Sequence, residues 1–307
     1  MHLRITIIVF FSFASWFSFA QGTSGKYLVE GLKISELKEE DKTLLDSCMQ
    51  LFQAATDDTS RLNALHIIYE TTWDNILKQK YAEWTVNKCD ELLNGTLDPR
   101  TNTAVKTYKA AALNCLGFVE YKFDHYPSAL ENWFESGKLR KSINDEQGQG
   151  QCFANSAYVY LKMGDTLKAL DYFEKGLEIY QRLDVKDMIA MSMNNLGYLY
   201  YNWNKKTRAI EYFRKSAALQ EELGKHKGLA TALNNIGGSF RDQEKFDSAL
   251  VYLGRSLKIR EEINDLEGLA ISNSNIGGVH FKMGNYDLAK NYGLKAMEYA
   301  EKTNFPD

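Results

Sequence analysis

"ALNNIGGSFR" (residues 232–241) returns forty residues later as "SNSNIGGVHF" (residues 272–281). Both stretches place glycine inside a predicted helix, where it costs about 1 kcal/mol relative to alanine. The stretches in the same register are "ALNCLGFVEY" (112–121), "CFANSAYVYL" (152–161) and "SMNNLGYLYY" (192–201). The chain therefore contains five ungapped units of forty residues, and such a period is the signature of a repeat architecture.

Three columns of the repeat contain only small residues. The first is Gly117, Ala157, Gly197, Gly237 and Gly277, the second is Ala129, Ala169, Ala209, Ala249 and Ala289, and the third is Ser136, Gly176, Ser216, Ser256 and Ala296. Because small residues let two helices approach closely, we interpret the first two columns as the crossing point of an antiparallel helix hairpin. The third column lies on the same face of the second helix, where it can meet the next unit. Close packing thus offsets the propensity cost of the glycines.

The composition favours a folded all-α protein. Of 307 residues, 44% are hydrophobic and 25% are charged, and these are globular values. There are only three prolines, which helix interiors tolerate badly. Lys and Arg total 37 against 40 Asp and Glu, so the chain lacks the basic excess that binds nucleic acid or anionic lipid.

The first twenty residues, "MHLRITIIVFFSFASWFSFA", carry a basic start, an apolar run and small residues before Gln21. This pattern predicts a signal peptide over 1–20, and residues 21–38 are interpreted as a linker. The alternative is an uncleaved membrane anchor, since the apolar run is only slightly too short to span a bilayer. We expect an exported protein, periplasmic or in the cell envelope.

Cysteine, histidine and motif content argue against a metal site or an enzyme. Export permits disulfides, and four cysteines allow three pairings, but no CxxC is present and we expect four buried free thiols. The five histidines are scattered singly, so we predict no metal site and no cofactor. Nucleophile, zinc-protease and phosphate-loop motifs are absent from the sequence. We predict a non-enzymatic protein.

The stretch "LGYLYYNWNKKTRAIEYF" (residues 196–213) resembles the tetratricopeptide repeat. That resemblance implies a right-handed superhelical solenoid of antiparallel helix hairpins. The usual unit has 34 residues, whereas this one has forty, and we expect the extra length to lie in the second helix. Units of forty residues are similar to those of kinesin light chains, of adaptors that orient the mitotic spindle and of exported sensor proteins from Bacteroidetes-type bacteria.

The resemblance covers residues 112–303 and weakens before them. Residues 39–111 are predicted to form N-terminal helices with one divergent repeat, which keeps the register with Leu77 in the glycine column and Cys89 in the alanine column. Residues 41–77 are predicted to hold two amphipathic helices split by "TDDTS" (56–60). Asp98 and Pro99 are a suitable cap and first residue for the next helix.

Tetratricopeptide domains bind ligands on the concave wall built from the first helices. Carried over by position, the ligand-facing candidates are Tyr158, Lys162, Asn194, Asn195, Tyr198, Tyr201, Asn202, Asn234, Asn235, Arg241 and Asn275. Asparagine with interleaved tyrosine suits an extended peptide, because amides bond its backbone and aromatic rings cover its side chains. The alternative for the column Asn155, Asn195, Asn235 and Asn275 is that these amides bond neighbouring repeats, and for Tyr198 and Tyr201 it is core packing.

Two functions follow as hypotheses. The first is a scaffold that binds a peptide or protein segment, as the extracytoplasmic sensing part of a signalling protein. The alternative is a structural or assembly factor of the cell envelope that acts through its convex face or open end. The last repeat ends near Thr303 with Leu288, Tyr292 and Met297 on an edge that nothing later in the sequence covers. We therefore expect the domain 112–307 to be open at its C-terminus and the chain to continue in a longer molecule, which would supply any membrane contact that an uncleaved N-terminus does not.

Overall fold

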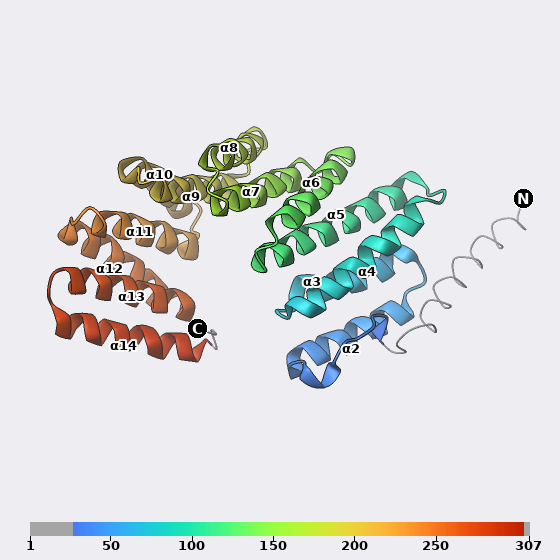
Figure 1. The fold of residues 1–307 in the computed structure, drawn as a ribbon, viewed down its shortest axis with the longest axis horizontal. Coiled ribbons are helices and arrows are strands. Elements are labelled where there is room, and N and C mark those ends of the chain that lie inside the picture. Colours follow the sequence, from blue (N-terminus) through green and yellow to red (C-terminus); the bar gives the residue numbers. More distant parts are fainter. Residues whose placement is uncertain (1–26, 304–307) are drawn as a thin grey trace, which may run out of the picture. The chain divides into compact units, whose positions relative to one another are not determined.

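A computed structural model describes residues 27–303, whose only regular secondary structure is helical, with no strand among them (Figure 1). The helices are α2 (Glu39–Ala54), α3 (Asp58–Thr71), α4 (Asn75–Leu93), α5 (Pro99–Lys122), α6 (Tyr126–Ser142), α7 (Glu146–Lys162), α8 (Thr166–Arg182), α9 (Lys186–Asn202), α10 (Lys206–Glu222), α11 (His226–Arg241), α12 (Phe246–Glu262), α13 (Leu266–Lys282) and α14 (Tyr286–Lys302). The all-α prediction is confirmed. The predicted signal peptide lies outside the described residues.

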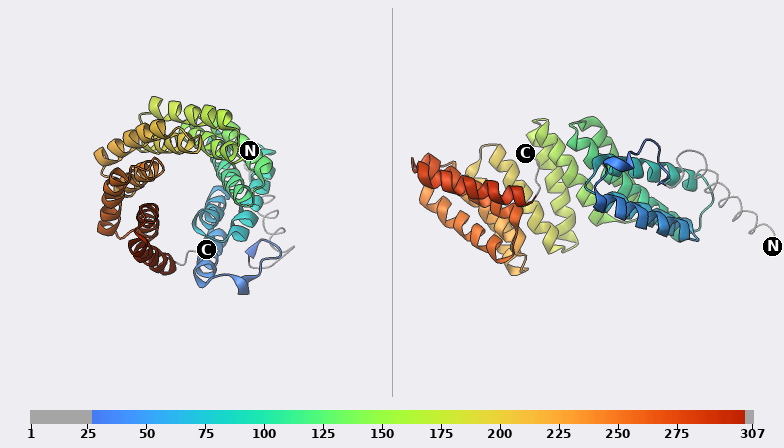
Figure 2. Two further views of the ribbon diagram at one scale, coloured as in Figure 1. Left: turned by 60° about the vertical axis from the view of Figure 1, so that its left-hand side comes forward. Right: turned by 90° about the horizontal axis from the view of Figure 1, so that it is seen from below.

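The chain divides into two compact units, residues 1–159 and 160–307, with the boundary inside α7. Within each unit, consecutive helices run antiparallel and lie side by side (Figures 1 and 2). The first helices of the predicted repeats are α5, α7, α9, α11 and α13, and the second helices are α6, α8, α10, α12 and α14.

Unit 1 begins with a packed segment where we expected a linker. Leu28, Val29 and Leu37 are buried against α2 and its neighbours, and the short helix η2 (Ile34–Glu36) lies between them. The hydroxyl of Tyr81 donates a hydrogen bond of 2.5 Å to the carbonyl oxygen of Tyr27. Residues 27–38 are therefore part of the fold, because their apolar side chains cover the first hairpin.

The divergent repeat predicted within residues 39–111 does not keep the register of the later hairpins. Leu77 and Cys89 lie on one continuous helix, α4, and not on two. The two helices expected over residues 41–77 are present as α2 and α3, and Asp57 caps α3 by accepting from the amide of Ser60 at 2.9 Å. The forty-residue register therefore does not extend upstream of α5.

Helix α5 begins as predicted. Asp98 accepts hydrogen bonds from the amides of Arg100 and Thr101, and Pro99 is the first helical residue. These bonds satisfy two of the amide donors that a helix start leaves unpaired.

The glycine column packs at the crossing of each hairpin. A methyl group on Gly197 would lie 2.6 Å from Cδ1 of Phe213, and one on Gly237 would lie 2.6 Å from Cγ of Leu253. In unit 1 a methyl group on Gly117 would lie 2.6 Å from Nε1 of Trp133. Since carbon atoms in contact stay about 3.5–4.0 Å apart, no larger residue fits without movement. The packing interpretation of the first column is confirmed.

The third small column meets the next first helix, as predicted. In unit 1 the thiol of Cys152 donates to Oγ of Ser136 at 3.4 Å, and in unit 2 the hydroxyls of Ser256 and Ser272 are 3.3 Å apart. The turns after the second helices each contain one left-handed residue, with φ of 59° at Asn144, 50° at Asp184, 64° at Gly224 and 52° at Asn264.

Two details differ from expectation. Helices α9 and α10 have 17 residues each, so the second helix is not the longer one and the extra length is shared between the helices. At the end of unit 2, Leu288 and Met297 are exposed, whereas Tyr292 stacks on His280.

All four cysteines are free and buried, as predicted. Burial raises the pKa of the Cys89 and Cys115 thiols to about 12.

Candidate functional site

The candidate site lies in unit 2, on the face formed by the first helices α9, α11 and α13. A pocket of about 140 Å³ is lined there by Tyr198, Tyr201, Phe213, Asn234, Asn235, Gly238, Arg241 and Asn275. Six of the eleven candidates therefore converge on one pocket. We call this pocket and the adjoining helix faces the groove.

The other candidates lie around the groove or away from it. Asn194 and Asn195 line an adjoining pocket of about 670 Å³ nearer the start of α9 and α11. Asn202 is exposed, and its Nδ2 donates to the carbonyl oxygen of Tyr198 at 3.0 Å. Lys162 is exposed at the end of α7, and Tyr158 belongs to unit 1, so neither is placed at this pocket.

The asparagine columns form a ladder between repeats. Nδ2 of Asn235 donates to Oδ1 of Asn194 at 3.0 Å, and Nδ2 of Asn275 donates to Oδ1 of Asn234 at 3.1 Å. Unit 1 contains the same bond from Asn155 to Asn114 at 3.0 Å. The alternative stated for this column therefore holds for Asn155, Asn235 and Asn275, whose amides bond the preceding repeat.

The ladder leaves some amide groups unused. Within residues 27–303, neither Asn194 nor Asn234 donates a hydrogen bond from its Nδ2 group. An amide offers two donors and an acceptor with two lone pairs, and the ladder uses only the oxygen of these two residues. The first asparagine column is thus held in orientation by the second and keeps its donors.

An ionic network closes one end of the groove. Nε of Arg241 donates to Asp242 at 3.0 Å, and Nη1 of Arg241 donates to Oδ1 of Asn275 at 2.9 Å. The hydroxyl of Tyr201 donates to the other oxygen of Asp242. Nζ of Lys206 lies 3.7 Å from the centroid of the Tyr201 ring. Tyr201 is therefore fixed from two sides, and it contributes a rigid wall.

The network keeps Asp242 ionised. Burial opposes ionisation, but hydrogen bonds from Tyr201 and Arg241 and the charges of Arg241 and Lys206 outweigh it, and the pKa of Asp242 is lowered. Burial, followed by the bond to Asp242, raises the pKa of Tyr201. At neutral pH the groove end therefore holds a carboxylate, a neutral phenol and a guanidinium.

The two glycines of "NNIGG" have different surroundings. Gly237 packs on Leu253, but a methyl group on Gly238 would meet no atom within 4 Å. Beside it, Tyr198 is 44% exposed, so Tyr198 is not a core residue. Gly238 has no packing reason to be glycine, and it leaves the α11 backbone accessible in the groove.

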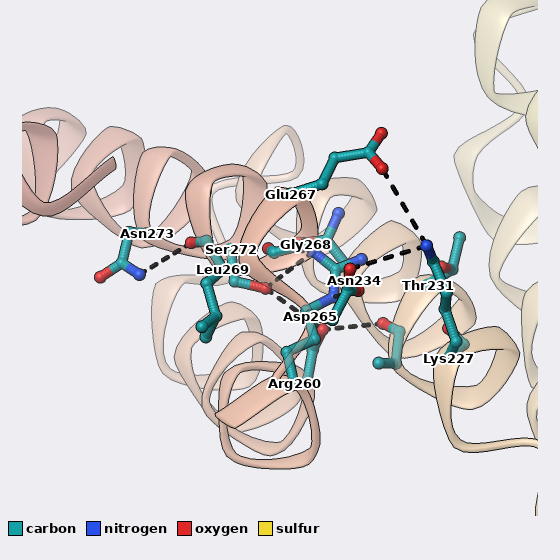
Figure 3. Close-up of polar contacts among 12 residues, drawn as sticks. Lys227, Thr231, Asn234, Arg260, Asp265, Glu267, Gly268, Leu269, Ser272 and Asn273 are labelled. Carbon is teal, nitrogen blue, oxygen red and sulfur yellow. Dashed lines mark hydrogen bonds and ion pairs between the residues drawn. The ribbon is translucent and has the colours of Figure 1, made fainter. Parts of the chain in front are cut away.

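Two arginine–aspartate ion pairs at the interfaces between repeats were not predicted from the sequence. In unit 2 the guanidinium of Arg260 is 3% exposed, lies 3.9 Å from Asp265 and donates to Ser272 at 3.1 Å and to the carbonyl oxygen of Gly268 (Figure 3). In unit 1 Arg140 pairs with Asp145 at 2.5 Å in the same way. The sequence does carry a pattern that could have predicted these ion pairs. In both repeats an arginine is followed five residues later by aspartate and three residues after that by glycine.

Residues 27–303 lack two further features, a metal-binding cluster and a membrane-spanning helix. No cluster of three or more histidine, cysteine, aspartate or glutamate residues could hold a metal ion. In the same range no helix combines the length and apolarity needed to cross a bilayer.

Comparison with known proteins identifies the repeat. Residues 150–222 and 188–262 match one sequence profile of the tetratricopeptide repeat, and residues 270–303 match another. Over these residues the chain is built of tetratricopeptide repeats, as its sequence predicted.

Solved structures share the fold. One is BtubC (BKLC) from P. vanneervenii, with a TM-score of 0.63 and 18% identity over 77% of this chain and 94% of that one. Another is a Rap protein complexed with competence and sporulation factor, with a TM-score of 0.54 and 16% identity over 87% of this chain and 88% of that one. At these identities the likeness shows the fold alone.

One curated relative matches a short region. Photosystem I assembly protein Ycf3 of Prochlorococcus marinus is 40% identical over 62 residues, which are 20% of this chain and 34% of that protein. The chain therefore spans about a third of that protein's length.

Proposed function

We propose that unit 2 is a protein-interaction scaffold that binds an extended peptide segment across α9, α11 and α13. The observation that carries this proposal is the position of Gly238, which has no neighbour within 4 Å of its missing side chain and lines the groove beside the exposed ring of Tyr198. A glycine inside a helix costs about 1 kcal/mol, and an approaching ligand backbone gives a reason for it.

The polar groups of the groove suit a peptide backbone. The Nδ2 donors of Asn194 and Asn234 are available for carbonyl oxygens of the ligand, and the ladder fixes their orientation. Tyr198 offers an aromatic surface to a ligand side chain, in the manner of buried tyrosines at interfaces. A Rap protein with the same fold has been solved in complex with competence and sporulation factor, which supports ligand binding by such a scaffold.

A peptide-binding assay tests the proposal. Random peptides are selected on the chain by display, and the affinities of the best binders are measured by fluorescence polarisation. We expect Tyr198→Ala and Gly238→Ala to weaken binding by about tenfold or more, as for a residue worth at least 1.4 kcal/mol. Val251→Ala is the matched control, because Val251 is an exposed apolar side chain on the second helix α12. Peptides that bind all four proteins equally well refute the groove as the binding site.

The cellular setting is part of the proposal. The apolar N-terminal sequence favours export, and the forty-residue unit resembles that of exported sensor proteins, so the scaffold is proposed to act in the periplasm or cell envelope as the sensing part of a signalling protein. Fractionation of the native host tests this. Recovery of the chain in the cytoplasm with residues 1–20 intact excludes an extracytoplasmic role.

The second candidate function is an assembly factor. The short match to a photosystem I assembly protein favours it, since the name of that protein states a role in assembly. In this case the second-helix surface carries the contact, and Val251→Ala rather than Tyr198→Ala weakens capture of the partner.

A further inference from the structure

The pocket of about 670 Å³ beside the groove holds the features of a second site. Its walls come from the start of α9, the last turns of α10 and the first turn of α11, all in unit 2. It adjoins the groove through Asn194, which lines the pocket and accepts the ladder bond from Asn235. We call it the Gln220 pocket.

The Gln220 pocket exists because one column of the repeat changes. The equivalent residue at the α12–α13 interface is Arg260, which fills the space and bonds Gly268 and Ser272 (Figure 3). At the α8–α9 interface the equivalent residue is Tyr180, which is buried. Glutamine at this position is shorter than either, and a cavity remains.

Two buried polar side chains face this cavity without a partner. Gln220 is 7% exposed and Ser216 is 1% exposed, and both line the pocket. Among residues 27–303, neither side chain makes a hydrogen bond. In the corresponding positions Ser136 and Ser256 donate to the carbonyl oxygens of Ala110 and Ala230 at 2.7 and 2.8 Å. Their polar atoms line the pocket and are not among the fully buried atoms without a partner, so a molecule bound in the pocket can reach them and supply the partner that such groups usually have.

The first turn of α11 also lacks its partners. No side chain caps this helix, and the amides of Lys227 and Gly228 make no hydrogen bond to any other described residue. In unit 1 the equivalent amide, that of Gly148, bonds Asp145 at 2.8 Å. A methyl group on Gly228 would lie 2.5 Å from the side-chain amide of Gln220, so the free amides and Gln220 lie together.

The first turn of α11 carries basic residues, which are unfavourable at the N-terminus of a helix. Residues 225–227 read Lys-His-Lys, although the N-terminus of a helix favours negative charge. Lys225 stands where Asp145 and Asp265 stand in the other interfaces. Lys225 pairs with Asp187 at 3.0 Å, and Lys227 lies 3.6 Å from Asp265 and 4.0 Å from Glu267. Lys225 and Lys227 therefore already have carboxylate partners, and the pocket lining also contains Asp187, whose Oδ1 is buried without a hydrogen-bond partner among the described residues.

We propose that the Gln220 pocket binds an oxyanion, a carboxylate or phosphate group, at the first turn of α11. The amides of Lys227 and Gly228 and the side chains of Gln220 and Ser216 donate to its oxygens, Lys225 supplies positive charge, and helix N-termini bind such groups in this way. Met188 and Met191, which also line the pocket, contact the apolar part of the molecule that carries the anion. This site does not depend on peptide binding in the groove.

Backbone amide NMR of the full chain tests the site with the simplest probes. The chain is titrated with sodium phosphate and, separately, with sodium acetate, and sodium chloride holds the ionic strength constant. We expect the amide resonances of Lys227 and Gly228 to shift and saturate. Saturation at lower phosphate than acetate assigns a phosphate group to the ligand, and the reverse order assigns a carboxylate.

Two variants and one control complete the test. Gln220→Met and Lys225→Gln are expected to lose the saturable shift, and Gln220→Met is expected to keep the wild-type melting temperature because it only removes an unpartnered amide. Lys245→Gln, at the equally uncapped start of α12, is expected to titrate like the wild type. The proposal is overturned if the wild-type resonances do not saturate with either anion, or if both pocket variants titrate like the wild type.

Discussion

Replacing the two neighbouring glycines of "NNIGG" separately, as Gly237→Ala and Gly238→Ala, tests the reasoning about packing and groove together. The substitutions are chemically identical and one residue apart on α11. A methyl group on Gly237 lies 2.6 Å from Cγ of Leu253 and 3.2 Å from the carbonyl oxygen of Ala249, whereas one on Gly238 has no neighbour within 4 Å. The two variants therefore differ only in what the new methyl group meets.

The two substitutions are expected to change the free energy of unfolding in opposite directions. Both variants gain about 1 kcal/mol of helix propensity. Gly238→Ala keeps that gain, so its free energy of unfolding should rise by about 1 kcal/mol. Gly237→Ala loses about 1–3 kcal/mol through overpacking, so its net change should be a loss of about 0–2 kcal/mol.

Urea unfolding of both variants, followed by circular dichroism, measures the difference. We expect Gly238→Ala to be the more stable of the two by about 1–3 kcal/mol while binding selected peptides more weakly than the wild type. Equal stabilities refute the packing of Gly237, and unchanged peptide affinity of Gly238→Ala refutes the role of Gly238 in the groove.

Three further predictions concern other parts of the chain. Denaturation without reductant should expose four thiols to labelling, and fewer than four labelled groups would indicate a disulfide. The native protein should be labelled slowly, because burial raises the pKa of the Cys89 and Cys115 thiols. Burial lowers the pKa of His66, so its contribution to stability is present above its ordinary pKa of about 6.5 and is lost as the pH falls through the lower folded value. His66→Gln should therefore lose less stability than the wild type between pH 7 and 5, and equal losses by urea unfolding contradict this. Asp265→Asn should lower the free energy of unfolding by about 3 kcal/mol, because it leaves the buried charge of Arg260 unpaired. Arg260→Met should lower it by less, since it removes that charge. The reverse order in the same assay would show that the contact between Arg260 and Asp265 is not ionic.

The repeats could be predicted from the sequence because the columns of small residues recur at a constant spacing of forty residues. Small residues recur without a gap over residues 112–296, and the steric reason for them is local to each hairpin. Upstream, the same register placed Leu77 and Cys89 on two helices, although they share α4. The small columns are missing there, so nothing in the residues marked the hairpin crossing.

The sequence indicated which side chains share one face of the first helices, but not how these side chains bond one another. The resemblance placed Tyr198, Asn234 and Arg241 on one face, and they line one pocket. Which amide bonds which depends on the distance between repeats, and a sequence carries no such distance. Gln220 was missed because the site candidates were taken from the first helices alone, although its column changes from Arg140 through Tyr180 to Gln220 and back to Arg260.

Site-specific photo-cross-linking tests the proposed peptide groove most directly. A benzophenone side chain is placed at position 198, in the groove, or at position 215, where Lys215 is exposed on the second helix α10, and each protein is irradiated in the native host. We predict that position 198 cross-links to a partner segment, that an excess of selected peptide suppresses this product, and that position 215 gives none. Cross-links to the partner from position 215 and none from position 198 would contradict the account, because the partner would then bind the second-helix surface.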